Sequence, residues 1–180
     1  AGMAQRFVPV DRLELVEQIA TDRGPDTDVY VGVLPRWRAA GSRRDVAGGA
    51  RVVWADCDEQ SAGTALAQFA SPPSLVVRSG TQGHRHVYWL LNETATVADV
   101  QRANGRLAFA LGADSRSAEA ARILRPPGTF NHKHSPPTAV VLGSCDVERR
   151  YVLHELVGHL PDAPDWRPGG TRHSRRRDKG

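Results

Sequence analysis

Apolar residues recur with helical spacing in four segments of the chain. In the longest segment, Val97, Val100 and Leu107 fall on one stripe, and Gly112 follows where the end of a helix favours glycine. Glycine or proline also follows the other three segments. The pattern therefore predicts helices over residues 12–21, 59–69, 96–111 and 152–157.

Shorter apolar or alternating runs predict strands. The runs at 74–78 and 85–91 flank the glycine-bearing turn 79–83, which favours an antiparallel hairpin. The order of strands and helices is typical of an α+β domain. We expect an RNA-recognition-like, mainly antiparallel sheet with helices packed on one face. The predicted strands are 29–34, 51–56, 74–78, 85–91, 121–124 and 138–142.

Composition fits one domain with tails. The chain has 180 residues and is 40% hydrophobic, which suffices for one sizeable core. No apolar run is long enough to span a bilayer, and no signal peptide is evident, so we expect a cytoplasmic protein without membrane contact. Cys57 and Cys145 lie far apart without CxxC spacing, which argues against a zinc ribbon.

The positive charge is concentrated at the end of the chain. The net charge is +4, yet residues 167–180 alone hold six arginines or lysines against one aspartate, so the remainder carries −1. We expect a disordered basic tail over 161–180, serving as a phosphate-binding arm, a linker or a solubilising end. The body of the protein is not basic enough for charge alone to indicate nucleic-acid binding.

Two carboxylates, Asp56 and Asp58, end the apolar run 52–55. On a strand, their spacing places both on one face and Cys57 on the other. Like charges this close are costly unless a cation lies between them, which favours a divalent metal. The alternative is that Asp58 and Glu59 open the following helix as N-cap and first-turn acid.

Further carboxylates follow the third predicted helix. Asp114 would complete an oxygen-rich site for Mg²⁺ or Mn²⁺ if it reaches the strand-end pair, and Glu119 offers a fourth acid. Spacing alone equally fits a loop acid after a helix end.

Histidines and basic residues provide candidate anion contacts. His84, His86 and Tyr88 share one strand face beside Arg78 and Ser79, and His86 suits a phosphate or sugar. Basic side chains also gather in two loops, where they fit either phosphate contacts or solvated surface. These are Arg36, Arg38, Arg43 and Arg44 in the first loop, and Arg122, Arg125 and Lys133 with Asn131 around the rigid turn Pro126-Pro127-Gly128.

Four motifs in order resemble the archaeo-eukaryotic primase superfamily, and more narrowly the primase or primase-polymerase domains of plasmid and other mobile-element replication proteins. The resemblance spans about residues 28–134. Pro126 replaces the usual leucine of the last motif, and the zinc-binding insertion of some members is absent. The motifs are Asp56-x-Asp58, Ser79-Gly80-x-x-Gly83-x-x-His86-x-Tyr88-Trp89, Gly112-x-Asp114, and Arg122-Ile-Leu-Arg125-Pro126-Pro127-Gly128-Thr129-x-Asn131-x-Lys133.

The resemblance implies a DNA-dependent nucleotidyltransferase that makes primers on single-stranded DNA from NTPs or dNTPs with two Mg²⁺ or Mn²⁺ ions. Asp56, Asp58 and Asp114 (or Glu119) would be the metal ligands, and His86 would contact the incoming phosphates. The implied domains are an N-terminal helical segment 1–27, a catalytic domain 28–160 and the tail 161–180, with a possible helicase or helix-bundle domain beyond. The expected nucleotide or template contacts are Arg36, Arg78, Ser79, His84, His86, Arg122, Arg125, Asn131 and Lys133.

Two other functions fit parts of the sequence. In a rolling-circle nicking endonuclease, His84 and His86 would bind metal and Tyr88 or Tyr151 would attack DNA, although Arg85 is a poor match between the histidines. A non-catalytic single-strand-binding module would need none of the acids.

Overall fold

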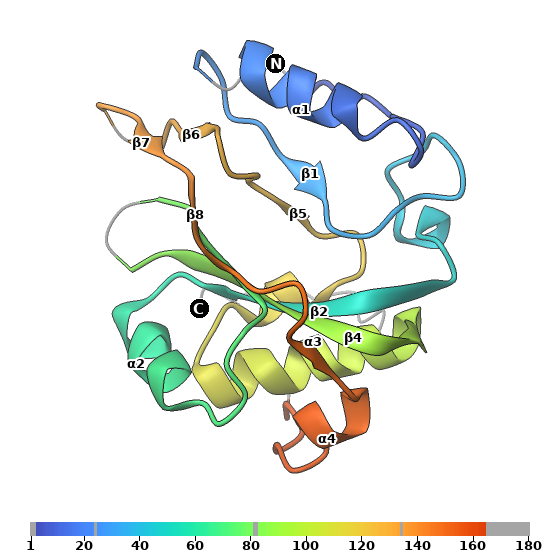
Figure 1. The fold of residues 1–180 in the computed structure, drawn as a ribbon, viewed down its shortest axis with the longest axis vertical. Coiled ribbons are helices and arrows are strands. Elements are labelled where there is room, and N and C mark those ends of the chain that lie inside the picture. Colours follow the sequence, from blue (N-terminus) through green and yellow to red (C-terminus); the bar gives the residue numbers. More distant parts are fainter. Residues whose placement is uncertain (1–2, 24, 81–82, 134, 165–180) are drawn as a thin grey trace, which may run out of the picture.

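The computed structural model describes residues 3–23, 25–80, 83–133 and 135–164. It shows a five-stranded sheet with helices on one side and a smaller unit of short strands and one helix on the other (Figure 1). The α+β class with a mainly antiparallel sheet is therefore confirmed. Most of the tail predicted over 161–180 lies outside the described residues, as does part of the 79–83 turn.

The main sheet has the strand order β2 (Gly49–Cys57), β4 (Arg85–Thr96), β3 (Leu75–Arg78) and β8 (Val141–Cys145), all antiparallel. A short strand, β9 (Arg150–Tyr151), adds a parallel pairing to β4. The predicted hairpin is the β3–β4 pair. In this register His86 lies opposite Asp56 on one side and Val77 on the other, so the hairpin carries a histidine to the strand-end acids.

Three helices cover the far side of the sheet: α2 (Gln60–Gln68), α3 (Val97–Leu111) and α4 (Leu153–Val157) (Figure 1). Thr96 caps α3 by accepting a hydrogen bond from the Asp99 N–H, and Gly112 ends it at φ 64°. The predicted C-terminal glycine is therefore confirmed, because this left-handed backbone favours glycine. Within the described ranges, no helix is long and apolar enough to cross a bilayer.

The smaller unit contains α1 (Glu14–Arg23), the pair β1 (Val31–Gly32) with β5 (Ile123–Leu124), and the pair β6 (Phe130–Asn131) with β7 (Thr138–Ala139). The strands predicted over 29–34 and 121–124 are thus only two residues long. Pro126 and Pro127 follow β5 closely and have no N–H group to extend the ladder. The strand predicted over 138–142 is divided between β7 and β8 at Val140, which pairs instead with Thr129 and Gly128.

The outer edge of β2 is covered by side chains and by the segment after α3. The Trp54 N–H donates to Oδ1 of buried Asn104 at 2.8 Å, and the Trp54 indole donates to the Ser117 carbonyl at 2.8 Å. The Asp114 N–H donates to the Asp56 carbonyl at 3.0 Å. Ser117 belongs to a 3₁₀ turn, η2 (Ser115–Ala118). These bonds satisfy the open strand edge and fix Asp114 beside Asp56.

Asn104 therefore supports the strand that ends in the acids. We expect Asn104→Ala to lower the free energy of unfolding by about 1–3 kcal/mol, because the buried Trp54 N–H would lose its partner. Urea denaturation measures the change, with Asn92→Ala on the exposed part of β4 as the control. Equal unfolding midpoints for the two variants would contradict the role of this bond.

Candidate active site

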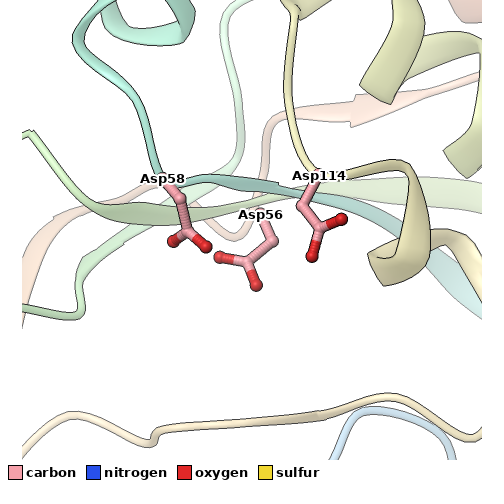
Figure 2. A group of neighbouring side chains, drawn as sticks. All are labelled: Asp56, Asp58 and Asp114. Atoms are coloured by element: carbon pink, nitrogen blue, oxygen red, sulfur yellow. The ribbon is translucent and has the colours of Figure 1, made fainter. Parts of the chain in front are cut away.

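Asp56, Asp58 and Asp114 converge at one end of the main sheet. One carboxylate oxygen from each lies within 4.8 Å of the others. Figure 2 shows the first two side chains leaving the end of β2 and the third leaving the segment after α3, all pointing to the same side. The N-cap of α2 is Glu59, without a side-chain capping bond. The alternative that Asp58 caps this helix is therefore wrong, and both strand-end acids face one space.

The third carboxylate is held by the residues that follow it. Oδ1 of Asp114 accepts hydrogen bonds from the backbone N–H and from Nε of Arg116, each at 3.0 Å. Burial by itself would raise the pKa of Asp114, but these bonds to Arg116 lower it. Glu119 lies elsewhere and pairs with Nε of Arg43 at 3.1 Å. Of the two acids considered from the sequence, Asp114 is the one that the fold brings to Asp56 and Asp58.

The acid cluster has the electrostatic character of a cation site. Burial raises the pKa of Asp58, and the negative charge of Asp56 raises it further. Oδ1 of Asp56 is buried and has no hydrogen-bond partner within the described residues. Three converging carboxylates with an unpartnered oxygen fit Mg²⁺ or Mn²⁺, which are hard cations that prefer oxygen ligands.

A cavity of about 220 Å³ opens beside Asp56 and Asp58, between the main sheet and the smaller unit. Basic and polar groups form much of its wall, and most of them were candidates from the sequence. The lining residues are Tyr30, Asp56, Asp58, Ser79, His84, His86, Arg122, Ile123, Leu124, Arg125, Asn131 and Lys133.

Two arginines of the β5 region differ in their roles. Arg122 donates from Nη2 to Oδ2 of Asp56 at 2.5 Å, and the same nitrogen lies 3.9 Å from Oδ2 of Asp114. Arg122 thereby offsets part of the repulsion among the acids. The Arg125 guanidinium is already engaged by neighbouring side chains. It donates to Oδ1 of Asp28 from Nε at 3.1 Å and from Nη2 at 3.0 Å, and it lies 4.6 Å from the centroid of the Tyr30 ring.

The two histidines approach the acids from β4 and the turn before it. Nδ1 of His84 lies 3.4 Å from Oδ1 of Asp58. Nε2 of His86 lies 3.6 Å from Oδ1 of Asp56, too far for a hydrogen bond. Burial lowers the pKa of His86 to about 4, although the charge of Asp58 acts in the opposite direction. His86 is therefore neutral at pH 7, and its Nδ1 is buried without a hydrogen-bond partner among the described residues.

Unsatisfied polar atoms are concentrated at this site. Among the described residues, four buried side-chain nitrogen or oxygen atoms have no hydrogen-bond partner, and three of them belong to Asp56, His86 and Arg122. The fourth is Nδ2 of Asn104. Because buried polar groups are normally paired, such a concentration indicates a site completed by a ligand.

Asn131 and Ser79 build the floor of the cavity around a close backbone approach. Nδ2 of Asn131 donates to the Ser79 carbonyl at 2.9 Å. A Cβ at Gly80 would lie only 2.6 Å from that amide nitrogen, so any larger residue there would displace the Asn131 amide. The Lys133 N–H donates to Oδ1 of Asn131 at 3.1 Å, which orients the Asn131 amide that links this loop to the hairpin turn.

Two predicted contact residues lie outside the cavity wall. Arg36 donates to the Leu34 carbonyl at 2.9 Å and to the Ala121 carbonyl at 3.3 Å, and Arg78 is exposed beside Gly143. Their contacts with nucleotide or template stay predictions. Sequence reasoning gave no role to Tyr30, which lines the cavity and bonds with Arg125. Only its place in the predicted strand 29–34 could have drawn attention to it.

The geometry predicts which acids bind metal. In isothermal titration calorimetry, we expect Mn²⁺ to bind the wild type, and to bind the Asp114→Asn variant at least about ten-fold more weakly. Mutation of residues that only support metal ligands already lowers metal affinity about 10–100-fold, so loss of a ligand should cost at least as much. Glu119→Gln, which removes a nearby acid outside the cluster, should bind Mn²⁺ like the wild type. The opposite ranking of the two variants would assign the third ligand to Glu119.

Comparison with known proteins agrees with this arrangement. No protein-family model matches the chain, and no relative is found among curated proteins. Among solved structures, the archaeo-eukaryotic primase domain of the primase-polymerase of cyanophage S-2L matches with a TM-score of 0.65 and 17% identity, covering 82% of this chain and 76% of that chain.

The primase RepB′ also matches, with a TM-score of 0.60 and 17% identity over 82% of this chain and 48% of that chain. Its catalytic domain in complex with initiator DNA gives a TM-score of 0.60 and 18% identity, covering 82% and 72% of the two chains. The order of motifs in the sequence indicated this architecture, and the structure has it. The chain therefore has the fold of archaeo-eukaryotic primase domains.

Proposed function

We propose that the chain is a primase-polymerase, a nucleotidyltransferase that makes primers on a single-stranded DNA template. The main support is the set of unsatisfied buried atoms on Asp56, His86 and Arg122, which lies beside a three-carboxylate cluster on a primase-type fold. A cluster of acids facing cationic side chains suits a ligand that combines divalent metal with phosphate.

The acids would hold two Mg²⁺ or Mn²⁺ ions. Ions held there would supply the chemistry of an in-line displacement, in which a 3′-hydroxyl is activated for attack and the pyrophosphate leaving group is stabilised. Asp56 and Asp58 supply oxygens from β2, and Asp114 supplies one from the segment that the β2 edge holds in place.

The cavity wall would bind the triphosphate of the incoming nucleotide. Lys133 and Arg122 provide positive charge, and neutral His86 adds a polar ring whose Nδ1 has no partner among the described residues. Nε of Arg122 has no partner within the described residues, so this guanidinium can reach a phosphate while Nη2 remains near the acids. Arg125 would have a structural role in the cavity wall instead of a direct phosphate contact, because Asp28 and Tyr30 already engage its side chain.

The template would be single-stranded DNA, and the substrates NTPs, dNTPs or both. One solved structure with this fold is a RepB′ catalytic domain in complex with initiator DNA, and another comes from a phage primase-polymerase. Replication of a plasmid, phage or other mobile element is the setting that we propose. The chain spans about half of the longer RepB′ chain, so a helicase or helix-bundle partner belongs to the proposal as well.

The nicking-endonuclease alternative has weaker support. Tyr88 does not line the cavity, and burial raises its pKa, which disfavours the phenolate that would attack DNA. The Tyr151 hydroxyl donates to the Pro72 carbonyl. A pure binding module would not explain why three carboxylates converge where they repel a nucleic acid.

We expect the protein to synthesise oligonucleotides on single-stranded DNA when NTPs or dNTPs and Mg²⁺ or Mn²⁺ are supplied. Changing both Asp56 and Asp58 to Ala should reduce synthesis to the level of a protein-free reaction. Glu93→Ala, an exposed acid on β4, is the control and should keep wild-type activity. Products resolved on a denaturing gel give the measurement, and retained synthesis in the double variant would overturn the proposal.

A further inference from the structure

Trp37 is a large aromatic side chain that the core does not use. Its exposed fraction is 66%, whereas Trp54 and Trp89 are fully buried. A tryptophan left in water forgoes about 1.5–3 kcal/mol or more of burial free energy. An exposed tryptophan on a soluble surface is therefore a candidate contact with another molecule.

The loop around Trp37 holds the ring in one orientation. The indole N–H donates to the Arg44 carbonyl at 3.0 Å, and the Trp37 backbone N–H donates to the Asp45 carbonyl at 3.0 Å. Asp45 is fully buried and closes a capping box with Ser42 at the start of the short 3₁₀ turn η1 (Arg43–Asp45). The ring is thus preorganised, which lowers the entropic cost of binding a partner.

The loop that carries Trp37 is rich in arginine. Residues 36–46 contain four arginines and a single acid, Asp45. The Arg38 guanidinium lies 5.4 Å from the Trp37 ring centroid and pairs with Asp45. Arg44 is exposed, and its side chain makes no ion pair with any described residue. We define Trp37, Arg38 and Arg44 as the Trp37 platform.

The platform is tied to the segment that carries the active-site arginine. Arg43 pairs with Glu119 at 3.1 Å, and Arg36 donates to the Ala121 carbonyl at 3.3 Å. Both contacts fall just before Arg122, the residue that bonds Asp56. Direct contacts therefore link the loop that carries the platform to the segment that carries Arg122.

We propose that the Trp37 platform binds single-stranded nucleic acid, with one base stacked on Trp37 and the adjoining phosphates contacted by Arg38 and Arg44. Aromatic rings stack on any base, and arginines follow the phosphate backbone, so the occupant fits both parts of the surface. That the bound strand is the template rests on the proposed function, whereas the binding itself does not.

The first test measures the affinity for a fluorescein-labelled single-stranded oligonucleotide by anisotropy, in EDTA and without nucleotides. Trp37→Ala should weaken binding by about five-fold or more, because stacking of one base is worth about 1–3 kcal/mol. Trp37→Phe should keep most of the affinity, since it retains a ring. Phe109→Ala removes an aromatic that is 50% exposed on α3 and serves as the matched control.

A second test reports on the ring directly. In a Trp166→Phe background, an unlabelled strand should quench the remaining tryptophan emission, because Trp54 and Trp89 are fully buried and only Trp37 is exposed among the described tryptophans. Arg44→Ala should reduce the slope of log Kd against log salt concentration by the amount expected for the loss of about one phosphate contact.

The outcomes separate this inference from the proposed function. Wild-type affinity in Trp37→Ala, or emission that the strand does not quench, would overturn the platform whatever the enzyme does. Primer synthesis that survives loss of Asp56 and Asp58, together with weakened binding in Trp37→Ala, would overturn only the proposed function. Thermal melting of each variant checks that the loop change leaves the fold intact.

Discussion

Repulsion among Asp56, Asp58 and Asp114 is the constraint on which the rest of the site depends. Their oxygens lie within 4.8 Å, and burial raises the pKa of Asp58. Like charges at this spacing, one of them buried, require compensating cations. Arg122 supplies one at Asp56 and Arg116 another at Asp114, yet Oδ1 of Asp56 has no partner among the described residues. The arrangement therefore favours binding of a further cation.

Neutral hydrogen bonds of the backbone hold these repelling groups in place. The Asp114 N–H bonds the Asp56 carbonyl, and the adjoining turn accepts from the Trp54 indole. These contacts do not depend on the ionisation of any carboxylate. The bond between the Asp114 N–H and the Asp56 carbonyl also satisfies a polar group on the edge of β2, so the bond that completes this edge positions the third acid. The stability of the fold and the geometry of the site therefore depend on the same strand edge.

Local signals in the sequence predicted the features that depend on local structure. The period-two spacing of Asp56 and Asp58 predicted a shared face, and Gly112 predicted the end of α3. The choice between Asp114 and Glu119 could not be made, because it depends on a long-range bond to Asp56 and an ion pair with Arg43. The lengths of the short strands β1 and β5 were overestimated, because the prolines downstream of β5 limit the pairing of the two strands.

The charges of the cavity also constrain how the proposed substrate would bind. Asp28 already pairs with Arg125 and neutralises its charge. The remaining cations, Arg122 and Lys133, therefore face three carboxylates. A triphosphate is repelled by such a surface until divalent cations reverse the local charge. Metal and nucleotide binding should therefore be cooperative, with Nε of Arg122 free to contact phosphate while Nη2 remains near the acids, as far as the described residues show. The Arg122–Asp56 bond offsets part of the repulsion among the acids, so the same guanidinium serves the acid cluster and the phosphate-facing wall.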